Sequence, residues 1–289
     1  MKIAIVGALL ALISGSTAFA GAEHLAALPP GVELGVYDIV GSFRRVPTIA
    51  YEHVWYRWDR PIDLSARLQV VTARDRNPLL TVEPYGPGNL LGDIAAGGYD
   101  SLITDIAQQV AALKTTVIVR FAPEMDHVSR VPWSLKEPSA YIAAYRHFVT
   151  KFRSIAPNSR QCWSPVGDKG LEVYYPGDDV VDYTGFSIYE IPECSTTWVG
   201  HPQSFADWMN DKYPLLARFG KPIILTEVGV VSTTDQKAWI RSAFASIGSY
   251  PYPLAKVFVY YNATDPVSWA RWGGPKKPSW VINPALFKN

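Results

Sequence analysis

The sequence predicts a single (β/α)8 barrel that follows a short N-terminal leader, and two observations lead to this fold class. First, eight short apolar segments are mostly separated by segments of helical periodicity, which is typical of parallel strands covered by helices. Second, eight such repeats favour closure of the sheet, and barrels of well over 200 residues routinely form one domain. An open doubly wound sheet is the alternative, but no glycine-rich phosphate-binding motif follows any expected strand.

The expected elements follow one another from residue 33 to the end of the chain. The strands are apolar runs over residues 33–38, 53–59, 78–85, 115–124, 160–165, 182–190, 221–229 and 255–263. The helices have apolar residues at three- and four-residue steps, as in Ile103, Ile106 and Val110. They cover residues 63–77, 99–113, 139–152, 204–220 and 234–248. We expect Pro214 to interrupt the helix over 204–220.

The first twenty residues have the pattern of a secretory signal peptide. Lys2 precedes an apolar run from Ile3 to Ile13, and the small residues ending at Ala20 supply an A-x-A cleavage site. The run is shorter than the roughly 20 residues that cross a bilayer, and no later segment fits a membrane span. We therefore expect cleavage near Ala20, a mature domain over 22–289, and a secreted or periplasmic protein with no membrane association.

Composition disfavours several classes of function. The 27 basic and 26 acidic residues leave a net charge of +1, so nucleic acid is not an expected partner. The five histidines and two cysteines occur in no metal-ligand spacing, and we expect neither a metal nor another cofactor. After export, Cys162 and Cys194 either form a disulfide or remain two separately buried thiols. The ten tryptophans and sixteen tyrosines supply a large aromatic core, a sugar-binding surface, or both.

Polar and aromatic side chains end the expected strands. Because the C-terminal strand ends form the active-site face of such a barrel, these side chains should meet at one rim. Glu124 ends the fourth strand and Glu227 the seventh, on opposing sides of the ring. A protonated carboxyl group facing a carboxylate is what glycoside hydrolysis requires. Either glutamate alone is more simply explained as a surface or salt-bridged residue, but the two together, in an exported and aromatic-rich barrel, favour catalysis.

Five stretches give the chain a resemblance to glycoside hydrolase family 26, a family of clan A that contains β-mannanases and related endo-β-glycanases. They are PLLTVEPY, GGYDSLITDIA, VIVRFAPEMDHVSRVPWS, VDYTGFSIYE and KPIILTEVG, in the family's order and over most of the mature chain. The resemblance implies that Glu124 is the general acid/base, that Glu227 is the nucleophile, and that Tyr189 donates a hydrogen bond to Glu227. The chain departs from the family at Pro123, where histidine is usual, and at Asp126, where asparagine is usual. Specificity for mannan therefore does not follow.

Further residues at the rim complete the predicted site. Arg120 is expected to hold Glu227 ionised, although a structural ion pair inside the barrel explains it equally well. Glu83 and Asp126 are expected to bind sugar hydroxyls, whereas His127 is interpreted as a loop residue. About half of the rim aromatics should belong to the core, because tryptophan is often largely buried. The predicted sugar-stacking residues are Trp58, Tyr85, Trp133, Trp163, Trp198, Trp269 and Trp272.

The leading hypothesis is a secreted, retaining endo-β-glycosidase that hydrolyses a mannan, a glucan or a bacterial exopolysaccharide. It would use a two-glutamate double displacement, with carboxyl groups about 5–5.5 Å apart. The alternative is a catalytically inactive, carbohydrate-binding barrel. A lyase or an aldolase ranks last, because no expected strand ends in a lysine or a metal-ligand cluster. We expect a polysaccharide as the partner and a monomeric protein.

Overall fold

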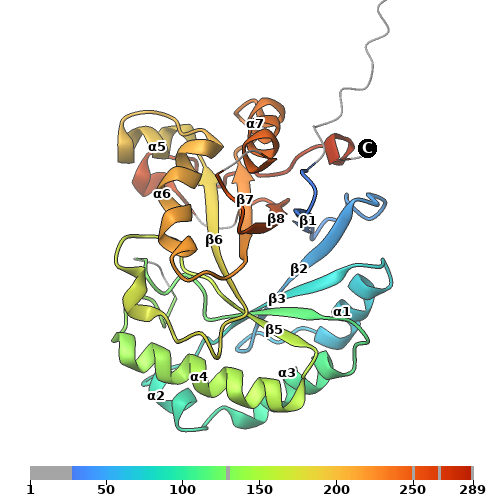
Figure 1. Cartoon of the computed structure of the whole chain (residues 1–289), viewed down its shortest axis with the longest axis vertical. Helices are drawn as coiled ribbons and strands as arrows, with labels where there is room; N and C mark the ends of the chain where they lie inside the picture. The colour runs from blue at the N-terminus through green and yellow to red at the C-terminus, as the bar shows by residue number, and fades with distance from the viewer. Residues whose placement is uncertain (1–27, 128–130, 249–250, 266–267, 288–289) are drawn as a thin grey trace, which may run out of the picture.

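The computed structural model describes residues 28–127, 131–248, 251–265 and 268–287, so the expected signal peptide lies outside the described residues. Eight parallel strands pair in sequence order, and the first strand also pairs with the last, which closes the sheet. The predicted (β/α)8 barrel is confirmed, and Figure 1 shows the helices around the outside of the strands.

The strands correspond one to one with the eight expected segments. Their bounds are β1 Glu33–Tyr37, β2 Ile49–Arg57, β3 Asn77–Glu83, β4 Val117–Phe121, β5 Ser159–Trp163, β6 Tyr183–Glu190, β7 Ile223–Val230 and β8 Ala255–Tyr261. The α-helices are α1 Leu64–Thr72, α2 Leu90–Ala95, α3 Asp100–Ala111, α4 Pro138–Ile155, α5 Pro192–Val199, α6 Phe205–Ala217 and α7 Gln236–Gly248. Short 3-10 helices cover Leu171–Tyr174, Ala270–Trp272 and Pro284–Phe287. The helices α2 and α5 were not expected from the sequence.

Helix α6 continues through Pro214, so the expected interruption there is wrong. Proline removes one backbone donor from a helix, but Tyr213 and Leu216 are buried on either side of it. A capping box formed by Ser204 and Asp207 also satisfies the first turn. Tertiary packing therefore outweighs the lost hydrogen bond.

The interior of the barrel changes character along its axis. Its lower part is apolar and contains Leu79, Ile118, Cys162, Ile224, Val257 and Val259. Gly185 keeps this part closely packed, because a Cβ atom there would lie 2.7 Å from Thr226 Cγ2 and 3.2 Å from Cys162 Sγ. Towards the C-terminal strand ends the buried residues become polar and include Thr81, Arg120 and Glu227. The fold therefore places charge at one end of an otherwise apolar barrel.

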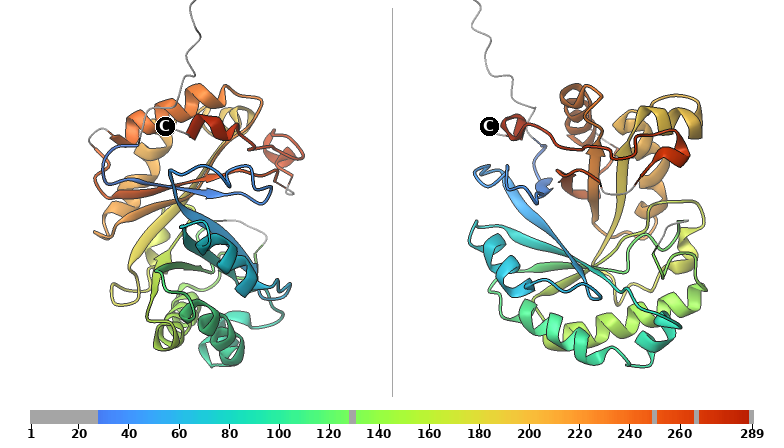
Figure 2. Two further views of the ribbon diagram at one scale, coloured as in Figure 1. Left: turned by 90° about the vertical axis from the view of Figure 1, so that its right-hand side faces the viewer. Right: turned by 180° about the vertical axis from the view of Figure 1, so that it is seen from behind.

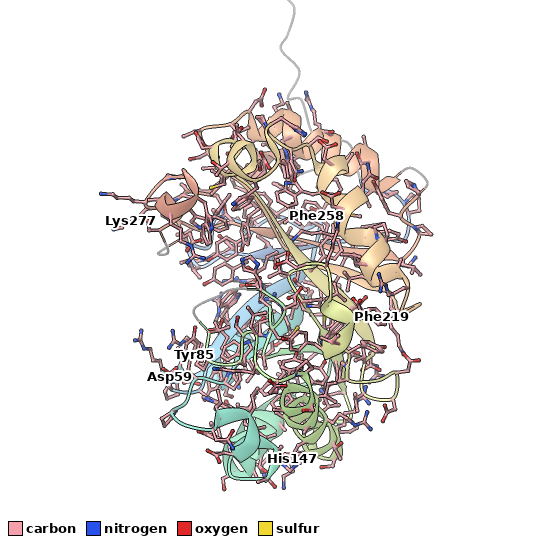
Figure 3. All side chains as sticks on the ribbon, turned by 90° about the vertical axis from the view of Figure 1, so that its left-hand side faces the viewer. Asp59, Tyr85, His147, Phe219, Phe258 and Lys277 are labelled. Carbon is pink, nitrogen blue, oxygen red and sulfur yellow. The ribbon has the colours of Figure 1, made fainter. Side chains whose placement is uncertain are left out.

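The helices divide into two groups around the barrel. Helices α1 to α4 cover one side and α5 to α7 the other (Figures 1 and 2). Asp59 and Tyr85, which follow β2 and β3, lie on the same side of the molecule as Lys277 from the segment after β8 (Figure 3). Among the described helices, none is long and apolar enough to cross a membrane.

Candidate active site

The turn after β4 presents Glu124 at the barrel mouth. Ala122 and Glu124 both have positive φ angles, 44° and 61°, on either side of Pro123. These left-handed conformations cost energy in residues that have a Cβ, so the surroundings must hold them. The Glu124 N–H donates to Ser164 O at 2.8 Å, and Trp133 Nε1 donates to Pro123 O at 2.7 Å. The acid/base candidate therefore stands on a strained but well-anchored turn.

Glu227 reaches the barrel mouth through an irregularity in β7. Counting by twos from the interior residue Ile224 leads to Thr226, so regular alternation would place Glu227 outside the barrel. The pairing of β6 with β7 shifts between Phe186 and Ser187, so that Ser187 pairs with Glu227. The bulge moves the interior face to the odd-numbered residues of β7, and Glu227 points inward with 3% of its surface exposed.

Arg120 joins the two glutamates. Its side chain is fully buried on β4, and its Nη1 donates to Glu227 Oε1. Its Nη2 lies 3.7 Å from Glu124 Oε1. Tyr189 donates its hydroxyl to the other oxygen, Glu227 Oε2. The Glu227 side chain is 4% exposed and that of Glu124 is 32% exposed, so one carboxylate is buried and hydrogen-bonded while the other is open to a ligand.

Electrostatic effects on Glu227 oppose one another. Burial raises the pKa of Glu227 to about 7 and the Glu124 carboxylate adds to the rise, whereas Arg120 and the Tyr189 hydroxyl lower it. Burial also raises the pKa of Tyr189 well above its ordinary value, so the phenol stays protonated and donates. Glu227 therefore changes its charge near neutral pH, within the range where a carboxylate nucleophile is useful.

Glu83 is a third carboxyl group at the same mouth. It ends β3 and is 7% exposed. Burial raises its pKa to about 7, and the charge on Glu227 adds to the rise. Tyr85, two residues after Glu83, is half-buried, and the Arg57 guanidinium lies 3.5 Å from the centre of the Tyr85 ring. Both predicted binding residues therefore remain candidates for contact with a ligand.

Three aromatic residues outside the predicted site form a cluster next to Glu227. The rings of Tyr37 and Tyr261 stack with centroids 4.8 Å apart, and Trp55 lies within 6.5 Å of both. The charge on Glu227 raises the pKa of each tyrosine, in addition to the larger effect of burial. Tyr37 ends β1, Tyr261 ends β8, and Trp55 lies on β2, two residues after the buried His53. Side chains two residues apart on a strand point to the same face, so this period was the sequence signal that could have identified Trp55.

A second aromatic group extends from Tyr189 towards α5. Trp269 lies 6.0 Å from the Tyr189 ring and 5.4 Å from Trp272, and Trp198 on α5 lies 6.4 Å from Trp269. Trp198 is 43% exposed, and Trp269 and Trp272 are half-buried. Trp280, buried beneath Tyr189 and Trp269, supports the group. The structure thus joins three of the predicted stacking residues into one surface next to the nucleophile candidate.

Three predicted stacking residues belong to the core instead. Trp58 is 6% exposed and its ring stacks on Tyr99, with centroids 4.9 Å apart. Trp133 and Trp163 are fully buried. Trp163 follows the interior residue Cys162 on β5, so alternation turns its side chain outward towards the helices. The expectation that these three bind sugar is wrong, because the strand period directs them away from the mouth or packing covers them.

Asp126 anchors the backbone next to the site. Its carboxylate accepts the backbone N–H groups of Val166, Gly167 and Asp168 at 2.7–3.0 Å. These three hydrogen bonds occupy most of its acceptor sites, and the expected role in binding sugar hydroxyls stays a prediction. Asp126 thereby joins the segment after β4 to the segment after β5. His127 forms a partly exposed ion pair with Asp168, which agrees with its interpretation as a loop residue.

The two cysteines do not form a disulfide. Both are free and buried, Cys162 inside the barrel and Cys194 beneath the aromatic group at α5. Of the two expectations from the sequence, a disulfide or two separately buried thiols, the structure has the second. Within the described residues, no group of three histidine, cysteine or acidic side chains has an arrangement that would hold a metal ion.

Comparison with known proteins relates the chain to glycan-degrading enzymes. No protein-family model matches it. It is 30% identical over 198 residues to endoglucanase H of Acetivibrio thermocellus, a match that covers 64% of this chain and 22% of that protein. It is 24% identical over 202 residues to the β-1,3-xylanase TXYA of a Vibrio species, covering 63% of this chain and 43% of that protein. The chain thus spans less than half the length of these curated relatives.

Solved structures show the same fold at lower sequence identity. The Bacillus subtilis mannanase man26 aligns over 91% of this chain and 85% of its own, with a TM-score of 0.61 and 16% identity. GH26A of a Muricauda species aligns over 80% and 83%, with a TM-score of 0.56 and 14% identity. Thermotoga maritima Cel5A aligns over 89% and 96%, with a TM-score of 0.59 and 12% identity. These glycoside hydrolases therefore share the (β/α)8 fold of this chain.

Proposed function

We propose that the protein is a retaining glycoside hydrolase that cleaves a β-linked polysaccharide within the chain. One observation carries this proposal: Glu124 and Glu227, from β4 and β7, both contact the guanidinium of Arg120, yet only Glu124 is open to solvent. Two carboxyl groups at close range in different environments are what a double displacement uses. The likeness to an endoglucanase, a xylanase and a mannanase supports the same class of reaction.

In the first step, Glu227 attacks the anomeric carbon and forms a glycosyl ester. Glu124 gives its proton to the departing glycosidic oxygen, so the leaving sugar is released as an alcohol. The hydrogen bonds from Arg120 and Tyr189 favour the ionised form of Glu227 before attack.

In the second step, Glu124 takes a proton from water while the water oxygen attacks the anomeric carbon. The ester bond breaks and Glu227 leaves as a carboxylate. The esterified Glu227 has no charge, so the Arg120 cation then faces the Glu124 carboxylate alone. Two inversions restore the original configuration.

The aromatic groups suit a substrate that extends on both sides of the cleavage point. Tyr37, Trp55 and Tyr261 lie on the β1, β2 and β8 side, and Trp269 and Trp198 continue outward towards α5. Flat rings stack on the C–H faces of sugars. The proposed substrates are a β-mannan, a β-glucan or a bacterial exopolysaccharide, and we propose that a monomer acts on them after secretion and cleavage near Ala20.

The direct test is release of reducing sugar from a panel of β-linked polysaccharides. Glu124→Ala should lower kcat/KM by about 10²–10⁴-fold, the share that general acid–base catalysis contributes. Glu227→Ala should leave no measurable turnover. Glu172→Ala is the matched control, because Glu172 forms an exposed ion pair with Arg218. The sugar released first should have the β configuration in its NMR spectrum.

Two outcomes would contradict the proposal. Release of the α anomer would show inversion and would exclude the double displacement. Equal binding of a polysaccharide by the wild type and both glutamate variants, with no new reducing ends, would identify a carbohydrate-binding barrel instead.

A further inference from the structure

Ser187 is a buried hydroxyl that contacts the acid/base candidate. It lies on β6, two residues before Tyr189, and is 4% exposed. Its Oγ donates to Glu124 Oε1 at 2.9 Å. Side chains two residues apart on a strand point to the same face. One face of β6 therefore presents one hydroxyl to each glutamate, Ser187 to Glu124 and Tyr189 to Glu227.

Arg120 determines where the Ser187 hydrogen points. The Arg120 Nη2 lies 3.4 Å from Ser187 Oγ, and a guanidinium group only donates hydrogen bonds. Ser187 therefore accepts from Arg120 with a lone pair. Its single O–H hydrogen is left for Glu124, so the hydrogen bond to Glu124 has one direction.

The backbone around Ser187 is held from two sides. Lys212 Nζ, from α6, donates to Ser187 O at 3.0 Å and to Val166 O at 2.7 Å. The β6–β7 bulge pairs Ser187 with Glu227. These contacts fix the backbone of Ser187 relative to both α6 and β7.

We propose that Ser187 is a positioning residue that assigns the catalytic proton to one oxygen of Glu124. The inference rests on the proposed glycosidase function. Ser187 donates to Oε1, and the Arg120 cation lies 3.7 Å from the same oxygen, so both groups favour the carboxyl proton on Oε2. Oε2 then gives the proton to the glycosidic oxygen in the first step and takes a proton from water in the second.

The test compares substrates that differ in their need for a proton from Glu124. Aryl glycosides with a good leaving group form the glycosyl ester without an acid, whereas a polysaccharide does not. The probes are the 2,4-dinitrophenyl and 4-nitrophenyl β-glycosides of cellobiose, mannobiose and xylobiose, together with the polysaccharide that the wild type degrades. Ser187→Ala should lower kcat on the polysaccharide by about ten- to a hundredfold, part of the 10²–10⁴ that acid–base catalysis supplies. KM and the burst of dinitrophenol should change less than threefold (about 0.6 kcal/mol).

Further variants separate positioning from packing. Ser187→Cys keeps the side-chain shape with a weak donor and should behave as Ser187→Ala does, whereas Ser187→Thr keeps the hydroxyl and should restore turnover. Ser159→Ala removes another buried serine, at the start of β5, and should change neither substrate class. In a Glu124→Ala background, Ser187→Ala should have no further effect.

A loss in the dinitrophenol burst as large as the loss in kcat on the polysaccharide would overturn the positioning role, and so would full activity of Ser187→Cys. Failure of the proposed function is distinct from either result, because the wild type would then release neither phenol nor reducing sugar from any probe.

Discussion

Replacing Glu83 with glutamine should stabilise the protein at alkaline pH and leave its stability in acid nearly unchanged. The folded protein holds the pKa of Glu83 at about 7, against an ordinary value of 4.5, because the side chain is buried and faces the charge on Glu227. Below about pH 4.5 the carboxyl is neutral in both the folded and unfolded states and has no effect. Between about 4.5 and about 7 only the folded state binds the proton, so stability falls as the pH rises.

The size of the effect follows from the same two values. The difference between 4.5 and about 7, at about 1.4 kcal/mol for each pKa unit, corresponds to about 3 kcal/mol. Glutamine keeps the shape and removes the ionisation, so Glu83→Gln should raise the free energy of unfolding above pH 7 by up to this amount. Glu227 titrates in the same range and is coupled to Glu83, so about 1–3 kcal/mol is expected.

The assay is thermal unfolding followed by circular dichroism at about pH 4.5 and about pH 8.5, with several degrees of gain in Tm expected only at the higher pH. Glu52→Gln is the matched control. Glu52 is also buried, but Arg67, Arg74 and Arg76 all donate to it, so its loss should destabilise the protein. A Glu83→Gln gain that is equal at both pH values, or a loss at the higher one, would refute the reasoning.

Four further predictions concern the site, the core and the thiols. Activity should fall as the pH drops below about 7, because Glu227 must be ionised to attack. The Tyr189 hydroxyl lowers the pKa of Glu227, so Tyr189→Phe should move this fall in activity to higher pH in a pH–rate profile. Trp55→Ala should raise KM on the polysaccharide about tenfold, the effect of about 1.4 kcal/mol, with little change in Tm. Trp58→Ala should instead lower the free energy of unfolding in urea by about 3–5 kcal/mol. Ellman's reagent should find two thiols only after unfolding, and a reductant should not change Tm; thiols that react in the native state would contradict their burial.

The sequence was sufficient for the fold class, and it singled out two glutamates that the structure brings to one guanidinium group. Alternation of apolar runs with helical periodicity is a local property, so β1 to β8 could be identified before any contact was known. Glu124 follows β4 and Glu227 lies in the C-terminal half of β7, and parallel strands bring these positions to one rim. The helices α2 and α5 escaped notice because they are only six and eight residues long.

The orientation of individual side chains was decided by tertiary structure. Trp58 and Trp163 were expected at the rim because they stand at strand ends, yet the pleat and the surrounding packing direct them into the core. Trp55 was passed over although the same alternation places it in the mouth. The pairing of the cysteines likewise depended on where their strands and helices packed.

The sequence by itself determined that charged residues gather at one end of an eight-stranded barrel, because both the strands and the polar residues near their ends are recognisable from the local sequence. Only the folded barrel decided that Glu227 faces Arg120 and that Ser187 faces Glu124. The reason is the bulge between β6 and β7: it inverts which residues of β7 point inward, and a bulge arises from the pairing of two strands rather than from the period of either one.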